Sequence, residues 1–336
     1  MMKKRLAFAV LVFGMMLALF GCKNGGEEVT LELSFGSRTG TYTGDMVDGV
    51  PNGQGKFTTE NDAGESWTYE GEFKNGHFEG EGKTTWDSGQ VEVGTYKNDV
   101  LVPMTGDDIK SLFTTPEDLK NHCVELVGKV FSAPEYGDGV VSLQMWTDYA
   151  NSENNIIVYI LDDTIDVNVD DYVRVVGIVG DVVTGVNAFG AELTVPSVTA
   201  SEYEILSYKD AVAPTVQEYE LGQSQSQYGY TITVEKVEFA EIETRVYVKV
   251  DNGGKATFDL YSFNTVVTQN GKQYEIQDNW EADYPEIQSN LYPGVSTEGV
   301  IVYPPMEQQD FQIIFDAYSD DYHEEIEKYV FDVTIP

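Results

Sequence analysis

The feature that most constrains the fold is an internal repeat rich in glycine and aromatic residues within residues 40–102. Two copies align without a gap and a partial third copy begins at Gly94. An Asn-Gly pair is typical of a hairpin turn with positive φ, and Gly-x-Gly pairs allow neighbouring backbones to approach closely. The repeat therefore predicts a stack of β-hairpins. Its defining residues are Tyr42, Gly44, Gly49, Gly53 and Gly55 in the first copy, and Tyr69, Gly71, Gly76, Gly80 and Gly82 in the second.

One hairpin alone cannot bury an apolar face, so stacked hairpins must share one. The residues expected on that face are Tyr69, Phe73, Phe78, Trp86 and Tyr96. The pattern Tyr-x-Gly-x-Phe/Tyr-x-x-Gly-x-x-x-Gly-x-Gly resembles MORN repeats, which we assign to residues 40–106. The resemblance implies either phospholipid binding or protein contact through the grooved aromatic face. Residues 42–103 contain 12 acidic residues and four lysines, which argues against an anionic lipid surface.

The N-terminus has the layout of an export signal. Lys3, Lys4 and Arg5 precede the apolar run Leu6–Phe20, which is short for a membrane span. The Gly21-Cys22 pair that closes it resembles a bacterial lipobox. The resemblance implies cleavage between these two residues and attachment of lipid, including a palmitoyl chain, to Cys22. An ordinary signal peptide or an N-terminal membrane anchor is the alternative. We expect residues 1–21 to be removed and residues 22–39 to tether the protein to the extracytoplasmic face of the cell membrane.

Charge excludes whole classes of partner. Removal of residues 1–21 takes away three of the 20 basic residues and none of the 57 acidic ones, which leaves a net charge of −40. Such a chain repels nucleic acid and anionic headgroups. With Cys22 as lipid acceptor, Cys123 is the remaining cysteine, so no intramolecular disulfide is expected, and a small buried hydrophobe is the favoured role for Cys123.

Residues 107–207 contain a succession of short strand-like runs. The sequence Thr115-Pro-Glu-Asp118 predicts a short helix that ends near His122. Five strands with Asp-rich turns resemble an OB-fold barrel, whose usual ligands are oligonucleotides and oligosaccharides. This segment holds 18 acidic and four basic residues, so a phosphate backbone would be repelled. The expected strands are Val124–Phe131, Val140–Thr147, Ile156–Leu161, Tyr172–Val183 and Ser197–Leu206.

The last third of the chain predicts a β-sandwich. Residues 208–227 carry Pro, Gln and Ser with few apolar residues, as a linker does. Residues 228–336 alternate apolar and polar positions around a turn at Asp251-Asn-Gly-Gly254 and a Tyr292-Pro-Gly-Val295 stretch. This pattern resembles the immunoglobulin-like domains of uncharacterised function that end many Gram-positive lipoproteins. The expected strands are Tyr230–Phe239, Arg245–Val250, Thr257–Phe263, Gly299–Val302 and Phe311–Phe315.

Catalytic signatures are absent from the sequence. The three histidines, His77, His122 and His323, are far apart, and there is no HExxH or Gly-x-Ser-x-Gly motif. The pairs Asp162-Asp163, Asp170-Asp171 and Asp320-Asp321 offer oxygen ligands for calcium, but a solvated acidic loop is the favoured interpretation of Asp162–Asp171. Most aromatic residues are expected in cores, with Trp280 as the one most suited to exposure.

These observations predict a mainly β protein with a MORN hairpin stack, an OB-like barrel and an immunoglobulin-like sandwich. We expect a lipid-anchored surface protein that binds a protein or envelope ligand without catalysis, cofactor or metal site. The alternative is a cation-dependent cell-envelope hydrolase that uses loop carboxylates.

Overall fold

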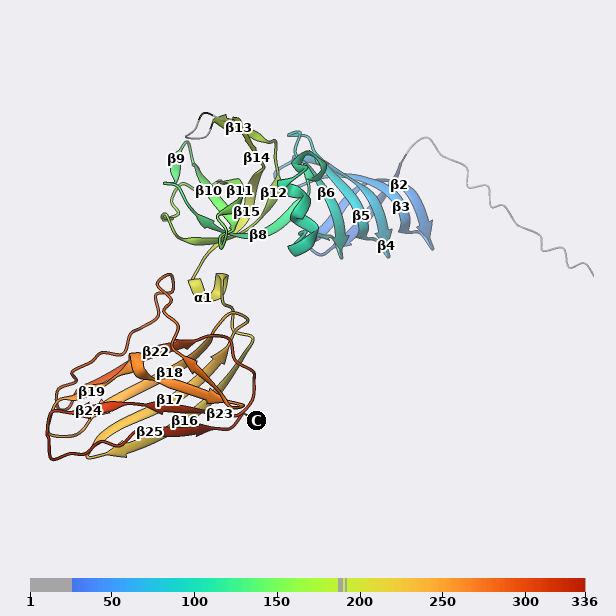
Figure 1. Cartoon of the computed structure of the whole chain (residues 1–336). Coiled ribbons are helices and arrows are strands. Elements are labelled where there is room, and N and C mark those ends of the chain that lie inside the picture. Colours follow the sequence, from blue (N-terminus) through green and yellow to red (C-terminus); the bar gives the residue numbers. More distant parts are fainter. Residues whose placement is uncertain (1–25, 187–189, 191, 336) are drawn as a thin grey trace, which may run out of the picture. The chain divides into compact units, whose positions relative to one another are not determined.

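The computed structural model describes residues 26–186, 190 and 192–335 (Figure 1). The predicted signal, its cleavage site and Cys22 lie outside these residues. The chain divides after Val102 into two compact units, both built of β-strands, as predicted. None of the helices in the described residues is long and apolar enough to cross a membrane.

The first unit is one antiparallel sheet whose strand order follows the sequence. Tight turns join consecutive strands, and the predicted turn at Asn75-Gly76 has φ values of 52° and 86°. Both values lie in the left-handed region, which suits a two-residue hairpin turn. The predicted hairpin stack is therefore confirmed. Its strands are β1 (Glu27–Leu33), β2 (Gly36–Val47), β3 (Val50–Glu60), β4 (Ser66–Lys74), β5 (His77–Trp86), β6 (Val91–Lys97) and β7 (Val100–Leu101).

The predicted tether is wrong over most of its length. β1 occupies Glu27–Leu33 and pairs with β2 in register from Glu27↔Tyr42 to Leu33↔Gly36. Leu31 and Leu33 are buried in the aromatic core of the sheet, at 3% and 6% exposure. The gain from burying these leucines explains why this segment joins the sheet. The sheet also ends earlier than predicted, at Leu101 rather than 106.

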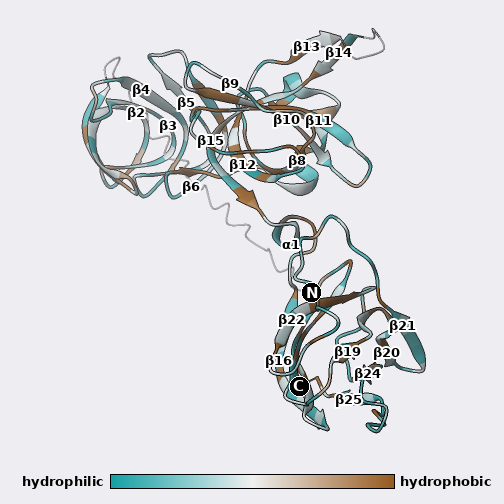
Figure 2. Cartoon of the chain, turned by 90° about the vertical axis from the view of Figure 1, so that its left-hand side faces the viewer, coloured by the Kyte–Doolittle hydropathy of each residue, from teal (hydrophilic) through white to brown (hydrophobic). Residues whose placement is uncertain are grey.

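The second unit begins with a closed five-stranded barrel. Its strands follow one another around the barrel in the order β8-β10-β11-β15-β12, and β12 pairs again with β8. Only the β11–β15 pair is parallel. Apolar residues alternate along these strands and fill the interior, visible as brown stretches in Figure 2. The barrel strands are β8 (Cys123–Val130), β10 (Val140–Asp148), β11 (Glu153–Ile160), β12 (Tyr172–Val179) and β15 (Ser197–Leu206).

Smaller elements surround the barrel. The helix predicted after Thr115 is only a four-residue 3₁₀ turn, and the Thr115 side chain makes no cap hydrogen bond. The segment is too short for a stable α-helix, because β8 begins at Cys123. The acidic segment between β11 and β12 is a loop without helix, as expected. The remaining elements are η1 (Gly106–Phe113), η2 (Pro116–Leu119), β9 (Glu135–Gly137), β13 (Val183–Val186) and β14 (Glu192–Val195).

A two-sheet sandwich completes this unit. One sheet has the order β16-β17-β18-β22 and the other β21-β20-β23-β25, with a core that includes Tyr230, Phe258 and Phe331 between them. A short pair, β19 and β24, lies beside them. The bounds are β16 (Gln217–Gln227), β17 (Tyr230–Phe239), β18 (Thr244–Asn252), β19 (Phe258–Leu260), η3 (Ser262–Asn264), β20 (Val266–Gln269), β21 (Lys272–Glu275), β22 (Ser296–Tyr303), β23 (Phe311–Phe315), β24 (Ala317–Ser319) and β25 (Tyr329–Val333).

The predicted linker, residues 208–227, is also wrong. It contains helix α1 (Tyr208–Ala211) and the edge strand β16. Two glutamine side chains of β16 form hydrogen bonds with backbone atoms in and just before β25. Gln225 Oε1 accepts from Val330 N at 3.2 Å, and Gln227 Nε2 donates to Glu327 O at 2.8 Å. Tyr219 and Leu221 pack against the sandwich core, but the second half of the strand, from Gly222 to Gln227, has no apolar side chain, so the strand has only a weak apolar pattern.

Candidate binding pocket

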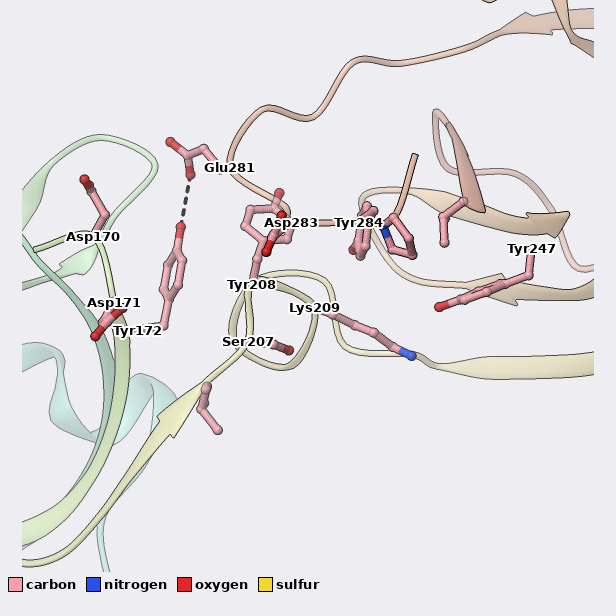
Figure 3. A pocket seen from close by; sticks show the side chains of 13 residues that line it. Asp170, Asp171, Tyr172, Ser207, Tyr208, Lys209, Tyr247, Glu281, Asp283 and Tyr284 are labelled. Atoms are coloured by element: carbon pink, nitrogen blue, oxygen red, sulfur yellow. Dashed lines mark hydrogen bonds between the residues drawn. The ribbon is translucent and has the colours of Figure 1, made fainter. Parts of the chain in front are cut away.

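The described part of the second unit contains a pocket of about 480 Å³ next to helix α1 (Figure 3). The barrel contributes the end of its 161–171 loop and the start of β12. The sandwich contributes residues from β18, from β22 and from the segment before it. Its walls are made mainly of tyrosines and carboxylates: Tyr172, Tyr208, Tyr247, Tyr284, Asp170, Asp171, Glu281 and Asp283.

The tyrosines contact one another in a row. Tyr172 and Tyr208 pack edge to face with ring centroids 6.1 Å apart, and Tyr208 and Tyr284 do so at 6.4 Å. Figure 3 accordingly shows Tyr208 between the other two. Edge-to-face pairs hold rings in a defined orientation. The row therefore forms a fixed aromatic wall in which Tyr208, from α1, is the central residue.

Glu281 connects the two sides of the pocket. The Tyr172 hydroxyl donates to Glu281 Oε2 at 3.0 Å, the dashed line in Figure 3. Lys129 Nζ lies 3.3 Å from Glu281 Oε1 and 3.4 Å from Asp170 Oδ1. Burial, with a contribution from the hydrogen bond to Glu281, raises the pKa of Tyr172, so its hydroxyl stays protonated and remains a donor.

A buried ionic network lies behind the sandwich side of the pocket. Arg245 is fully buried and donates to Glu238 Oε2 at 3.0 Å and to Glu243 Oε1 at 2.7 Å. It also donates to Ala213 O at 2.8 Å and to the Tyr284 hydroxyl at 3.1 Å. Since a guanidinium offers five donors in a fixed plane, it can hold these groups at once. Arg245 thus fixes the connector after α1 and the position of Tyr284.

Glu238 links the same network to α1. Burial raises the pKa of Glu238, but hydrogen bonds from Lys209 and Lys236 outweigh it and lower the pKa to about 2. Lys209 Nζ lies 2.8 Å from Glu238 Oε2, and Lys236 Nζ lies 2.6 Å from Oε1. The charge of Lys209, a basic residue of the pocket lining, is therefore directed away from the pocket carboxylates, as Figure 3 shows.

Four of the repeat glycines predicted from sequence, Gly44, Gly55, Gly71 and Gly82, form with Gly94 an unbroken row across five strands of the first unit. The in-register pairs are Gly44↔Gly55, Gly55↔Gly71, Gly71↔Gly82 and Gly82↔Gly94.

Tyrosine rings cover this glycine row. A Cβ on Gly82 would lie 2.4 Å from the Tyr69 hydroxyl, and one on Gly55 would lie 2.3 Å from that of Tyr42. The Tyr69 hydroxyl donates to Glu72 O at 3.0 Å, which fixes the ring in place. Close backbone approach is thus only part of the reason for glycine, because the covering tyrosine is the main obstacle at Gly82.

The aromatic face expected to contact a partner is buried within its own unit. Tyr42, Tyr69, Phe73 and Phe78 are at most 3% exposed, and Tyr69 and Phe78 stack at 3.9 Å. Curvature of the sheet and the leucines of β1 close over these rings. In the folded unit these rings form a core rather than an open contact surface, and contact of the repeat with a protein partner stays a prediction.

The other candidate residues lie apart from one another. His77 Nδ1 is 2.8 Å from Asp99 Oδ2, and the buried Asp99 carboxylate also accepts from the backbone N of Ser34 and of Phe78. Cys123 is buried, as expected, and Trp280 is 88% exposed, also as expected.

The aspartate pairs do not form a cation site in the described residues. These residues contain no group of three or more His, Cys, Asp or Glu side chains placed to hold a metal ion. Asp170 and Asp171 line the pocket, whereas Asp162 accepts from Thr164 and Tyr203.

Sequence reasoning missed the pocket tyrosines. The chain has 21 tyrosines, so no single one stands out. The Asp-Tyr dipeptides at Asp171-Tyr172 and Asp283-Tyr284 gave no usable signal, because the same dipeptide also occurs outside the lining at Asp148-Tyr149 and Asp321-Tyr322. The proximity of the pocket tyrosines follows from the tertiary fold.

Comparison with known proteins agrees with the repeat geometry. The MORN repeat family matches residues 42–62 and 69–91, so this is a mainly β protein with MORN repeats. No curated protein matches the chain. A solved structure described as the conserved domain protein from Bacillus anthracis aligns with 92% of this chain and 90% of its own. Its identity is 9% and its TM-score 0.28, too low to support an argument about fold or function.

Proposed function

We propose that this is a lipid-anchored binding protein of the extracytoplasmic membrane face, which holds its ligand in the tyrosine pocket without chemistry. The observation that carries the proposal is the lining of the pocket. None of the 13 residues that line it is a histidine or cysteine, and the Ser207 hydroxyl donates to Asp210 Oδ2 at 2.6 Å. Pockets with aromatic walls and a few placed polar groups are typical of ligand recognition.

The architecture of the second unit supports a recognition role. We propose that its barrel is an OB-fold, because the strand order β8-β10-β11-β15-β12 closes a five-stranded barrel of that kind. The two-sheet region is proposed to be immunoglobulin-like on the basis of its facing antiparallel sheets. Both architectures commonly serve as binding modules. The acidic charge of the barrel still argues against nucleic acid.

The membrane location is proposed from the sequence alone, since Cys22 lies outside the described residues. A Cys22→Ser variant should leave the membrane fraction or retain its signal, whereas the wild type should incorporate radiolabelled fatty acid. Absence of label from the wild type would contradict the anchor.

The binding role is tested against hydrolysis with envelope material. The full chain is incubated with purified cell-envelope polymers, with and without calcium, and both retained ligand and released fragments are measured. We expect retention without fragments. Calcium-dependent release that is lost in Asp170→Asn or Asp171→Asn would replace binding by the cation-dependent hydrolase.

A further inference from the structure

Three of the four tyrosine rings in the pocket already hold a cation of the protein itself. A cation within about 6 Å of a ring centroid is attracted to the π-face. Each of these three rings is therefore already in contact with a positive charge of the protein. The pairs are Lys129 Nζ with Tyr172 at 5.5 Å, Lys236 Nζ with Tyr247 at 4.4 Å, and Arg245 Cζ with Tyr284 at 5.8 Å.

The ring of Tyr208 and the carboxylate of Asp283 contact no cation of the protein in the described part of the chain. Among the described residues, Tyr208 has no cation at its ring, although it is the central tyrosine of the row. The Asp283 carboxylate likewise has no hydrogen-bond or ion-pair partner in the described part of the chain. Both line the same pocket. An aromatic face and an unpaired carboxylate are the two groups that recognise an ammonium ion.

The charge around these two groups has the same sign. Asp170, Asp171 and Glu281 also line the pocket, and the amine of Lys209 is bound to Glu238. Lys129 neutralises only part of this charge, through Asp170 and Glu281. Clefts lined by one sign of charge concentrate ligands of the opposite sign.

We propose that the pocket binds a small organic cation with primary ammonium groups, one of which lies over Tyr208 and pairs with Asp283. This inference rests on the proposed binding function and names its ligand class. The volume of about 480 Å³ falls in the range of small-molecule sites. A bare calcium ion fits the site less well, because it needs six to eight oxygen ligands and the described residues supply no such group.

The test is calorimetric titration of the full chain at 150 mM salt with spermidine as the probe. Three compounds serve for comparison. Triethylene glycol is a flexible chain without charge, acetyl-Lys-Lys-amide carries the same ammonium group on a peptide, and calcium is an inorganic cation. We expect spermidine to bind at one site and triethylene glycol not to bind. Stronger binding of the peptide would assign the ammonium group to a protein ligand, and stronger binding of calcium would overturn the proposal.

Variants localise the binding. Asp283→Asn and Tyr208→Leu should each weaken spermidine by about tenfold or more, since each removes one recognising group. Asp278→Asn, an exposed carboxylate of the same segment outside the lining, should leave the affinity unchanged. Equal losses in all three variants would indicate diffuse attraction and contradict the site.

Two further outcomes separate this inference from the proposed function. If none of the cations binds, the ligand class is wrong while the binding function stands. If mass spectrometry of recovered spermidine shows a changed product, the non-catalytic function itself is wrong.

Discussion

The tyrosine hydroxyls of the repeat sheet and those of the second unit donate to different kinds of acceptor. In the repeat sheet, Tyr42 and Tyr69 cover glycines and donate to a carbonyl three residues further along the chain. In the second unit, Tyr172 and Tyr284 donate to carboxylates more than 40 residues away in sequence. The first arrangement closes a core, and the second leaves polar groups and ring faces at a pocket. This difference supports the proposal that ligand recognition lies in the second unit.

The largest effect is expected from removing the central cation of the ionic network. Arg245→Met leaves Glu238 and Glu243 buried without their guanidinium, which should cost about 3–5 kcal/mol of unfolding free energy. Urea unfolding measures it. Lys249→Met, which also replaces a basic residue of this strand by Met but at a partly exposed position, should change stability by less than about 1 kcal/mol. Equal effects in the two variants would mean that burial of the Arg245 network is irrelevant to stability.

A somewhat smaller effect is expected in the repeat sheet. Gly82→Val places side-chain atoms where the Tyr69 ring lies and should cost about 3 kcal/mol. Lys83→Ala, the exposed neighbour on the same strand, should be nearly silent. Thermal melting of the full chain with near-UV circular dichroism distinguishes them. A Gly82→Val melt at the wild-type temperature would refute the role of the covering ring.

The smallest effect concerns acid stability. The folded pKa of Glu238, about 2, lies below its ordinary value of 4.5, so the ionised form contributes stability that is present above about pH 4.5. This contribution should be lost as the pH falls from about 4.5 towards 2. Unfolding free energies of wild type and Glu238→Gln over this range measure it. The difference should shrink as the pH falls; a constant difference would contradict the shifted pKa.

The same contrast explains how much of the structure could be predicted from the sequence. The hairpin stack was accessible because Gly71, Gly76 and Gly82 occur at the same spacing as Gly44, Gly49 and Gly55, and because their contacts lie within one hairpin or between adjacent strands. The five barrel strands were also accessible from their alternation. The strand β16 was missed because its second half has no apolar residue and is held by hydrogen bonds of Gln225 and Gln227.

The pocket was not predictable for a related reason. Its groups come from the barrel, α1, β18 and the segment before β22, and each is an ordinary Asp or Tyr in its own stretch of sequence. Likewise the partner of His77 is Asp99, which lies in the turn between β6 and β7, and no spacing rule indicated the pair. Only the tertiary fold brings such residues together.

Hydrogen exchange of the full chain, with and without spermidine at a concentration near the wild-type dissociation constant, tests the central contrast most directly. The account predicts slower exchange in peptides that cover residues 170–172, 206–209 and 281–285, with no change across residues 42–96. Protection within residues 42–96, or equal protection of the Asp283→Asn variant, would contradict the assignment of ligand recognition to the tyrosine pocket.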